Sequence, residues 1–387
     1  MKVISTNQEL VALCNKAQNQ PFITLDTEFV SEKTYYPQLC LIQIALPEKN
    51  DLECSEFIID VLSPKLRLGA LTEIFMNPGI KKVFHSAKQD LEIFWHVFGE
   101  IPEPLFDTQI AAMLCGYGSQ ISYSNLVKDI CKTNLDKSQQ FSNWSTRPLT
   151  KRQLNYAVSD VTHLRQVYIN LYKKLFENRR LEWVEELITE MSEGCKNSYK
   201  PEEAWKKIKT RNISAEGWTI LYALAEFREL EAQTRNLPRR WVLSDHAILE
   251  LISVKPRTLE ELRSCRFFNV GRKAQNRFTM GLLEVIRKAI ANPKALPLIV
   301  QPKKPRNSNK EVTDLLKVYL RFSSEQSGVA EELISTTDEL REISQGNLNV
   351  RPLKGWRKKV FGDNAIKLCQ GKIALTIENS NLAVVGK

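Results

Sequence analysis

The sequence predicts an α/β domain followed by all-α domains, and three observations support this order. Strand-like and helix-like segments alternate over residues 1–195, whereas from Pro201 to Asn292 apolar residues recur only at helical spacing. The charge changes at the same place, since residues 1–195 carry 20 Lys+Arg and 24 Asp+Glu, and residues 196–310 carry 24 and 11. The 387-residue chain is also longer than one hydrophobic core usually spans, so two or three domains are expected.

The first domain is expected to contain a mixed sheet. Four apolar segments bounded by turn residues have the composition of strands: Phe22–Phe29, Leu39–Ala45, Phe57–Asp60 and the short Lys82–His85. A helical pattern follows from Ser86 to Phe98, and the residues after Leu105 are mostly helical in pattern. Three successive strands followed by alternation with helices are typical of α/β folds.

Two polar stretches divide the chain into three predicted domains. We interpret SEGCKNSYKP, near Gly194, and ALPLIVQPKKPRNSNK, which is rich in Pro, Lys and Asn, as linkers. The predicted domains are residues 1–195, 205–293 and 310–387. The last is helical in pattern from Glu311, and its final stretch, KIALTIENSNLAVVGK, is strand-like or irregular.

The composition is that of an ordinary soluble globular protein, with 43% hydrophobic and 26% charged residues. No run of about 18 apolar residues exists, so no transmembrane helix is expected. The N-terminal stretch MKVISTNQELVAL lacks the apolar core of a signal peptide. The eight cysteines are scattered without a C-x-x-C pair or zinc-type spacing, which favours reduced thiols and a cytoplasmic protein.

The excess positive charge is confined to the middle of the chain. The formal net charge of +10 is the sum of −4 for residues 1–195, +13 for residues 196–310 and +1 for residues 311–387. Two interpretations fit. The middle segment is either a solvated basic surface that maintains solubility, or a module that binds a polyanion.

Two carboxylates share one face of the first predicted strand. In Ile23-Thr-Leu-Asp26-Thr-Glu28-Phe29, Asp26 and Glu28 project to the same side because residues i and i+2 of a strand do so. Adjacent carboxylates in an apolar strand repel each other and lose hydration, and divalent cations would offset both costs. A solvated strand end is the commoner reason for a D-x-E sequence, but the apolar flanks make it less suitable here.

Two further elements carry acidic residues in helical contexts. Asp90 in VFHSAKQDLEIF falls in the first turns of the helix that follows the fourth strand, where an acidic residue often only complements the helix dipole. Tyr156 and Asp160, in Tyr156-Ala-Val-Ser-Asp160, lie one turn apart on the same helix face. Taken alone, each of these spacings is commonly incidental.

The order of the three elements is more specific than any one of them. A D-x-E strand, then Asp on a helix, then Y-x-x-x-D on a later helix resembles the three motifs of DEDDy 3′–5′ exonucleases of the DnaQ-like superfamily. Four blocks resemble the ribonuclease D family in particular: LDTEFVSEKTYYPQLCLIQIA, VFHSAKQDLEIF, LFDTQIAA and WSTRPLTKRQLNYAVSDV. The resemblance covers residues 1–195 and implies a ribonuclease H-like (DnaQ-like) α/β fold for them.

The resemblance also implies roles for these residues in two-metal catalysis. Two divalent ions about 4 Å apart activate a water molecule and stabilise the leaving 3′ oxygen. Oxygen ligands favour Mg²⁺ or Mn²⁺ over zinc. Asp26 would contact both ions, Glu28 and Asp160 the ion nearer the attacking water, and Asp90 the other. Tyr156 would orient the water, since a tyrosine whose ordinary pKa is about 10 is a poor base.

Six other residues are candidates for binding substrate. Phe29 and Tyr35 could stack on the terminal bases, although core packing is an equal alternative for both. Arg147 could contact a phosphate, with a salt bridge as the alternative. The remaining candidates lie beside the proposed metal ligands: Thr27, Gln89 and His85, for which a structural role is an equal alternative.

The middle segment resembles a second family. GWTILYALAEFRELEAQTRNLPRRWVLSDHAILELI and LRSCRFFNVGRKAQNRFTMGLLEVI are similar to the HRDC domain, a small all-α bundle. The resemblance and the local charge of +13 favour contact with RNA. Residues 310–387 are expected to hold a second, diverged HRDC-like copy. Their near-neutral charge suggests packing rather than nucleic-acid binding.

The predicted function is that of a monomeric 3′–5′ exoribonuclease that releases 5′-mononucleotides. The family resemblance points to the 3′ ends of tRNA precursors as substrates and to no membrane partner. Two alternatives remain. A DNA exonuclease of the same superfamily would need the same carboxylates. An inactive nucleic-acid-binding protein would have no use for clustered carboxylates near a polyanion.

Overall fold

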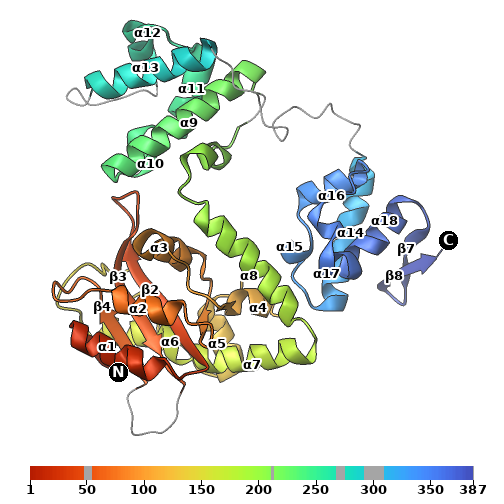
Figure 1. Ribbon diagram of the computed structural model, residues 1–387. Coiled ribbons are helices and arrows are strands. Elements are labelled where there is room, and N and C mark those ends of the chain that lie inside the picture. Colours follow the sequence, from red (N-terminus) through yellow and green to blue (C-terminus); the bar gives the residue numbers. More distant parts are fainter. Residues whose placement is uncertain (48–54, 211–212, 267–274, 292–308, 387) are drawn as a thin grey trace.

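The computed structural model describes residues 1–47, 55–210, 213–266, 275–291 and 309–386 (Figure 1). The chain forms an α/β domain, a middle helical domain and a C-terminal domain, in that order (Figure 1). Long helix α8 (Leu181–Lys196) closes the α/β domain and leads toward the middle domain. No helix in the described part of the chain is both long enough and apolar enough to cross a membrane.

The α/β domain is built on one six-stranded sheet with the order β1-β4-β3-β2-β5-β6. β3 pairs antiparallel with both β2 and β4, and the other three pairings are parallel. The strands are β1 (Lys2–Ile4), β2 (Phe22–Val30), β3 (Gln38–Ala45), β4 (Glu56–Asp60), β5 (Lys81–Phe84) and β6 (Leu105–Asp107). The four predicted strands and the mixed sheet are confirmed. The two edge strands, β1 and β6, were not predicted, because each is only three residues long and too short to show alternation.

Helices cover both faces of this sheet. α6 packs on β2, β3 and β4, where Leu41, Ile58 and Ala157 share a buried cluster. The opposite face, which includes Leu25 and Ile42, belongs to the main core. The helices of the domain are α1 (Asn7–Ala17), α2 (Gly69–Phe75), α3 (Lys88–Phe98), α4 (Thr108–Met113), α5 (Tyr123–Cys131), α6 (Lys151–Thr162), α7 (Leu164–Glu177) and α8.

The predicted linker near Gly194 is wrong, since α8 continues to Lys196. Val184, Leu187 and Cys195 on one face of α8 are buried in the main core, and this packing outweighs the polar composition and the low helix propensity of glycine. A short 3₁₀ helix, η1 (Pro201–Lys207), follows. Residues 295–308 of the second predicted linker lie outside the described residues.

The middle domain is helical throughout its described residues, as predicted. Its elements are α9 (Ala215–Arg235), α10 (Arg239–Val242), α11 (Asp245–Val254), α12 (Leu259–Ser264) and α13 (Gln275–Ala291). The long α9 contacts η1, α10, α11 and α13, so it forms the centre of this domain. Asn236 ends α9 in the left-handed conformation, with φ of 46°, and so turns the chain into α10.

The C-terminal domain repeats the spacing of the middle domain. α15, α16 and η2 each begin 92 residues after α10, α11 and α12, and Gly328 is left-handed where Asn236 is in the middle domain. Its elements are α14 (Lys310–Ser327), α15 (Glu331–Ile334), α16 (Thr337–Ser344), η2 (Arg351–Leu353), α17 (Gly355–Arg357), the π-helical turn η3 (Lys358–Gly362) and α18 (Asp363–Cys369). The strand-like end is a hairpin of β7 (Ile373–Glu378) and β8 (Asn381–Gly386).

The C-terminal domain packs against the α/β domain. The rings of Trp183 and Trp356 stack with centroids 4.7 Å apart. The buried guanidinium of Arg357 donates hydrogen bonds to Glu186, at 2.5 Å, and to Glu190, at 3.4 Å, on α8. One hydrophobic core includes residues of both domains. The packing role predicted for this near-neutral segment therefore agrees with its contacts.

Candidate active site

Strand β2 presents two carboxylates on the face that α6 covers. Asp26 and Glu28 are two residues apart in β2, so their side chains project to the same side. The hydroxyl of Thr24, on the same side, donates a hydrogen bond of 2.8 Å to the Val161 carbonyl of α6. This bond ties β2 to α6 next to Asp160.

Helix α6 brings a third carboxylate to the same place. A capping box between Thr150 and Gln153 fixes the first turn of α6, and Asp160 lies in its last turns. Carboxylate oxygens of Asp26, Glu28 and Asp160 all lie within 4.8 Å of one another. The structure therefore brings together three of the four acidic residues that the sequence singled out, from segments 132 residues or more apart.

Asp90 lies beside β2 through its contact with Thr27, and it is not one of the three carboxylates that converge within 4.8 Å. It lies in the first turn of α3 and is buried, and its Oδ1 accepts a short hydrogen bond from the hydroxyl of Thr27. Asp107 fixes the turn between β5 and α3, because its carboxylate accepts hydrogen bonds from the backbone N–H groups of Ser86 (3.2 Å) and Ala87 (2.8 Å). The same carboxylate caps α4. Asp107 thus positions the start of α3, a role that the sequence did not reveal.

Burial raises the pKa values of all four carboxyl groups, and mutual repulsion adds to this for Asp26 and Glu28. Burial has the largest effect on Asp26, and the charges of Asp90, Asp160 and Glu28 add to it, so its pKa lies well above the usual range. Burial, then Asp160 and Asp90, raises the pKa of Glu28 to about 9. Burial raises the pKa values of Asp90 and Asp160 to about 7. Four carboxyl groups held this way are destabilised as anions unless a cation compensates them.

Tyr156 lies one helical turn before Asp160 and is half-buried. Its ring packs beside the buried Trp144, with centroids 6.0 Å apart. Burial and the negative charges of Asp160, Glu28 and Asp26 raise the pKa of its hydroxyl. The phenol is therefore protonated at neutral pH and suited to hold a water molecule by a hydrogen bond, not to remove a proton from it.

The residues fit divalent metal ions. All the donors are carboxylate oxygens, which hard cations prefer, and three of them already converge within 4.8 Å. A cation there would stabilise the charged form of the carboxylates and offset the repulsion that adds to the raised pKa values of Asp26 and Glu28. Among the described residues, the cluster includes no cysteine or histidine, which disfavours a zinc-type site.

Comparison with known proteins agrees with this geometry. A family model described as 3′-5′ exonuclease matches residues 1–176, which include all four carboxylates and Tyr156. A ribonuclease D from Jannaschia sp. is 40% identical over 99% of this chain and 98% of its own length. A second, from Nitrobacter hamburgensis, is 38% identical over 100% of this chain and 99% of its own.

The chain belongs to the ribonuclease D family of 3′–5′ exoribonucleases.

Two further matches extend this assignment beyond the nuclease domain. A family model described as HRDC domain matches residues 219–286, so the middle domain is an HRDC domain, which implies nucleic-acid binding. The crystal structure of Escherichia coli RNase D, described as an exoribonuclease involved in structured RNA processing, superposes with a TM-score of 0.79 at 28% identity. That match covers 95% of this chain and 98% of the other, so the fold is shared along nearly the whole length.

Gln43 is a neighbour of the ribonuclease D carboxylates that the sequence did not single out. It lies directly opposite Asp26 in the β2–β3 pairing, and such pairs project to the same face. Its side chain is fully buried, and neither amide atom has a hydrogen-bond partner in the described structure. A buried amide without a partner is costly. Its position beside Asp26 provides a reason for its presence, because the amide can interact with the metal ions and water that the carboxylates would bind.

The substrate residues predicted beside the carboxylates have different surroundings. The side chain of Thr27 is buried against Asp90, so it supports that carboxylate and does not reach the surface. Both ring nitrogens of His85 are engaged inside the protein, one with the Thr108 hydroxyl at 3.0 Å and one with the Ile121 carbonyl at 3.1 Å. These contacts favour a structural role for the Thr27 and His85 side chains, and the predicted substrate contact of both stays a prediction. Gln89 is exposed next to Asp90 and stays a candidate.

For two further residues the contacts favour the alternative to substrate binding. Arg147 forms a two-bond ion pair with Asp60, at 2.9 and 2.6 Å, and also donates to the carbonyls of Trp144 and Cys40, so it anchors the loop before α6. Tyr35 is only 7% exposed and packs into the HRDC core, which leaves no ring face for a base. Phe29 is half-buried against the main core, and no contact decides between its two alternatives.

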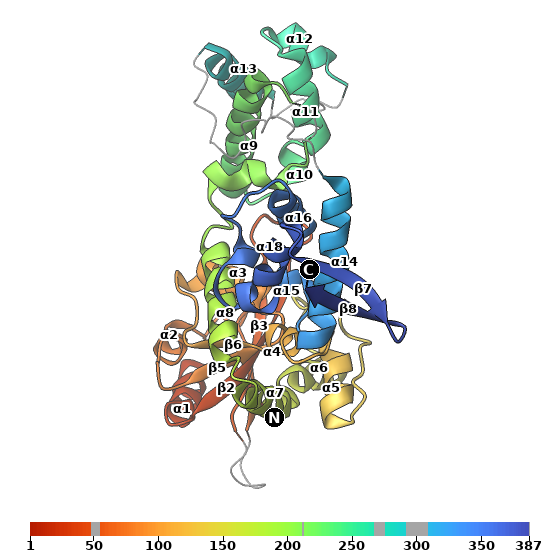
Figure 2. The ribbon, with the colours of Figure 1, turned by 90° about the vertical axis from the view of Figure 1, so that its right-hand side faces the viewer.

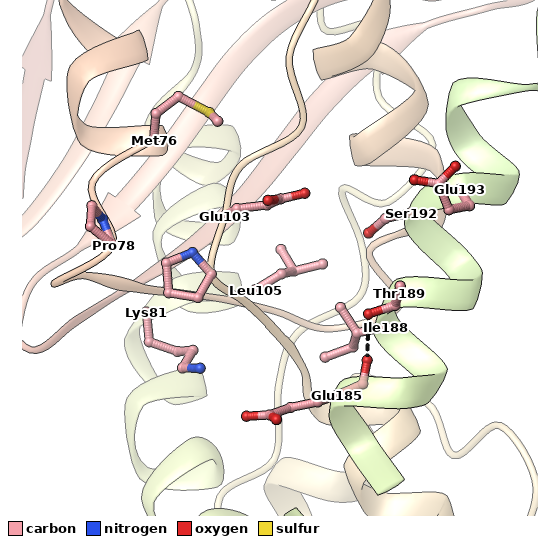
Figure 3. A pocket seen from close by; sticks show the side chains of 11 residues that line it. Met76, Pro78, Lys81, Glu103, Leu105, Glu185, Ile188, Thr189, Ser192 and Glu193 are labelled. Atoms are coloured by element: carbon pink, nitrogen blue, oxygen red, sulfur yellow. Dashed lines mark hydrogen bonds between the residues drawn. The ribbon is translucent and has the colours of Figure 1, made fainter. Parts of the chain in front are cut away.

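One groove on the nuclease domain lies apart from these residues. A groove of about 620 Å³ runs between α8 and the β5–β6 edge of the sheet (Figure 3). Glu103, Glu185 and Glu193 line it, with Lys81 as the single basic residue. Its acidic lining would repel phosphate groups, and none of the candidate catalytic residues lines it.

Proposed function

We propose that this chain removes nucleotides one at a time from RNA 3′ ends and releases 5′-mononucleotides, with Mg²⁺ or Mn²⁺ held by the carboxylate cluster. The observation that supports this most directly is the convergence of Asp26, Glu28 and Asp160 within 4.8 Å on the face of β2 beneath Tyr156. Asp90 supports the same site from α3.

The proposed roles follow from the positions of the side chains. Asp26, Glu28, Asp90 and Asp160 would hold the ions, which supply an activated water and stabilise the charge on the leaving oxygen. Tyr156, which is protonated at neutral pH, would donate a hydrogen bond that orients the water. Asp107 and Thr27 keep Asp90 in place. Gln89 and Phe29 are candidates for contact with the terminal nucleotides.

The proposed natural substrates are the 3′ ends of tRNA precursors. The basic HRDC domain supports a substrate larger than a short oligonucleotide, because residues 196–310 carry a net charge of +13 that can neutralise phosphates distant from the cleaved bond. The description of the E. coli protein, which acts in structured RNA processing, supports the same choice. No described contact of the carboxylate cluster distinguishes ribose from deoxyribose.

We also propose three units for the chain, residues 1–195, 205–293 and 310–387, the last a second and diverged HRDC-like copy. The shared 92-residue spacing of α10, α11 and α12 with α15, α16 and η2 supports this.

The seven cysteines that the structure describes are all free, which supports a reducing, cytoplasmic location. A monomer is proposed, to be checked by light scattering.

The test is a comparison of matched substrates. Purified protein with Mg²⁺ is incubated with a 5′-labelled tRNA precursor that carries a 3′ extension and with DNA of the same sequence. We expect a ladder of one-nucleotide steps on the RNA and slower shortening of the DNA. Equal rates would favour a general 3′–5′ exonuclease. Absence of metal-dependent shortening on both would contradict the proposed function.

A further inference from the structure

Helix α10 carries two outward-facing side chains, those of Arg240 and Trp241. Of its four residues, Arg239 and Val242 face inward, since Arg239 bonds to the buried Glu229 and Val242 is buried. Arg240 and Trp241 face outward. Trp241 is 54% exposed, and Arg240 forms no ion pair or hydrogen bond within the described structure. An exposed indole next to an uncompensated guanidinium is an unusual use of surface.

The corresponding edge of the C-terminal domain, at α15, is covered by the nuclease domain. The positions 92 residues later are Glu332 and Leu333 on α15. The carboxylate of Glu332 accepts hydrogen bonds from the Ser119 hydroxyl of the nuclease domain, at 2.5 and 2.7 Å. Leu333 packs against the core that the two domains share. In the C-terminal domain this edge is thus an acidic and apolar docking surface.

The same edge of the HRDC domain has the opposite charge and only part of it is covered. Arg239 and Asn236 contact the loop between β2 and β3, while Arg240 and Trp241 beside them do not. A guanidinium suits a phosphate, and an indole suits a nucleobase, which stacks on it with any sequence. The +13 charge of residues 196–310 favours a polyanion over another protein as the occupant.

We propose that Arg240 and Trp241 form a binding site for single-stranded RNA, with the base stacked on Trp241 and a phosphate on Arg240. This inference rests on the proposed function. It names the place where the strand is held upstream of the 3′ end that is cleaved.

The site lies within reach of the carboxylates. Arg239 donates a hydrogen bond of 2.9 Å to the hydroxyl of Tyr35, and Tyr35 follows Glu28 by seven residues. Seven residues span at most about 25 Å even when fully extended. Figures 1 and 2 both place α10 above the loop that joins β2 to β3. A strand whose 3′ end occupies the cluster would therefore reach α10 after a few nucleotides.

The experiment measures RNA binding by the full chain in the inactive Asp26→Asn background, with 5′-fluorescent single strands of about 3 and about 12 nucleotides. Trp241→Ala should weaken binding of the longer strand by roughly tenfold and leave the shorter strand unchanged. Trp241→Phe should retain most of the affinity, because a ring still stacks. Arg240→Gln should reduce the slope of log affinity against log salt by about 0.7, whereas Trp241→Ala should not change it.

The matched control is Phe176→Ala, which removes a ring that is 68% exposed beside Lys173 and Lys174 on α7 of the nuclease domain. We expect it to bind both strands as the parent does. The inference is overturned if Trp241→Ala binds the longer strand normally, if it weakens both strands equally, or if the control loses as much. Because binding is measured in an inactive protein, these outcomes are separate from a failure of the parent enzyme to shorten RNA, which would contradict the proposed function instead.

Discussion

The hydroxyl of Tyr35 donates a hydrogen bond of 2.5 Å to the carboxylate of Glu229, 194 residues further along the chain. Glu229 is fully buried in the HRDC domain, and Arg239 donates two hydrogen bonds of 2.6 Å to it. Burial alone would raise the pKa of Glu229, but the hydrogen bonds from Arg239 and Tyr35 outweigh it and lower this pKa. Tyr35 follows the strand that carries Asp26 and Glu28, so this contact fixes the HRDC domain to that strand.

Tyr35→Phe should loosen this junction. The variant keeps the ring but removes a hydrogen bond to a charged group, which costs about 1.5–3 kcal/mol. The backbone N–H groups of Tyr35 and Tyr36 both donate to Asn236, so their hydrogen exchange reports directly on the junction. We expect exchange at both amides to be at least about tenfold faster. Tyr36→Phe is the control, since no hydrogen bond of its hydroxyl is described. Unchanged exchange in Tyr35→Phe would show that the hydroxyl contributes nothing to docking.

Stabilisation by Mn²⁺ should grow as the pH rises from 6 to 9. The carboxyl pKa values are raised in the folded protein, to about 7 for Asp90 and Asp160 and about 9 for Glu28. Each carboxyl group stabilises the folded state while it is protonated. In the metal-free protein this stability is lost as the pH rises above the unfolded-state pKa, about 4, and through the folded-state pKa. A bound cation reverses the loss. The measurement is Tm in EDTA and in Mn²⁺ across this range.

Asp160→Asn should show a smaller and flatter increase in Tm with Mn²⁺, because one carboxylate is missing from the cluster. An increase of the same size at every pH for the parent protein would mean that the ions bind elsewhere.

Gln43→Leu should weaken metal binding without destabilising the fold. Leucine has a similar volume, and replacing a buried amide that has no partner removes a cost rather than a bond. If the amide serves the groups bound by Asp26, the affinity for Mn²⁺ should fall by about tenfold or more, as for other residues that support metal ligands. Calorimetric titration measures this affinity. Gln38→Leu, at the exposed end of the same strand, is the control, and equal affinities in all three proteins would exclude a role for Gln43.

Tyr156→Phe should lower kcat with little change in KM. The phenol is assigned to the attacking water and not to substrate binding, so its loss removes an interaction that is formed in the transition state. A decrease of about 10²–10⁴-fold is expected for a positioned proton donor or acceptor. Steady-state kinetics on a short single-stranded RNA would check this, and a change confined to KM would move Tyr156 to substrate binding.

The sequence signals that indicate a carboxylate site are local. The i, i+2 spacing of Asp26 and Glu28 decides their shared face inside one strand, and the i, i+4 spacing of Tyr156 and Asp160 does the same inside one helix. Whether the strand carboxylates lie next to Asp160 depends on how α6 packs on the sheet. The spacing does not decide this, and the prediction came from the family resemblance.

The contacts that the sequence left open depend on partners far along the chain. Arg147 pairs with Asp60, 87 residues away, and Tyr35 with Glu229. No local pattern distinguishes a tyrosine that stacks on a base from one buried under another domain. Gln43 was missed for the same reason, since only the β2–β3 register places it opposite Asp26. The helix through Gly194 was missed because burial against the core, and not composition, decides it.

The most direct test of the whole account is the rate of RNA shortening by Asp26→Asn. Asp26 is one of the three carboxylates that converge within 4.8 Å, and loss of one metal ligand should remove several kcal/mol of transition-state stabilisation. With 5′-labelled single-stranded RNA and Mg²⁺, we expect the parent protein to produce a ladder of one-nucleotide steps from the 3′ end. Under the same conditions the variant should bind the RNA and leave it intact. A variant that kept more than about a tenth of the parent rate would contradict metal-dependent catalysis at this site.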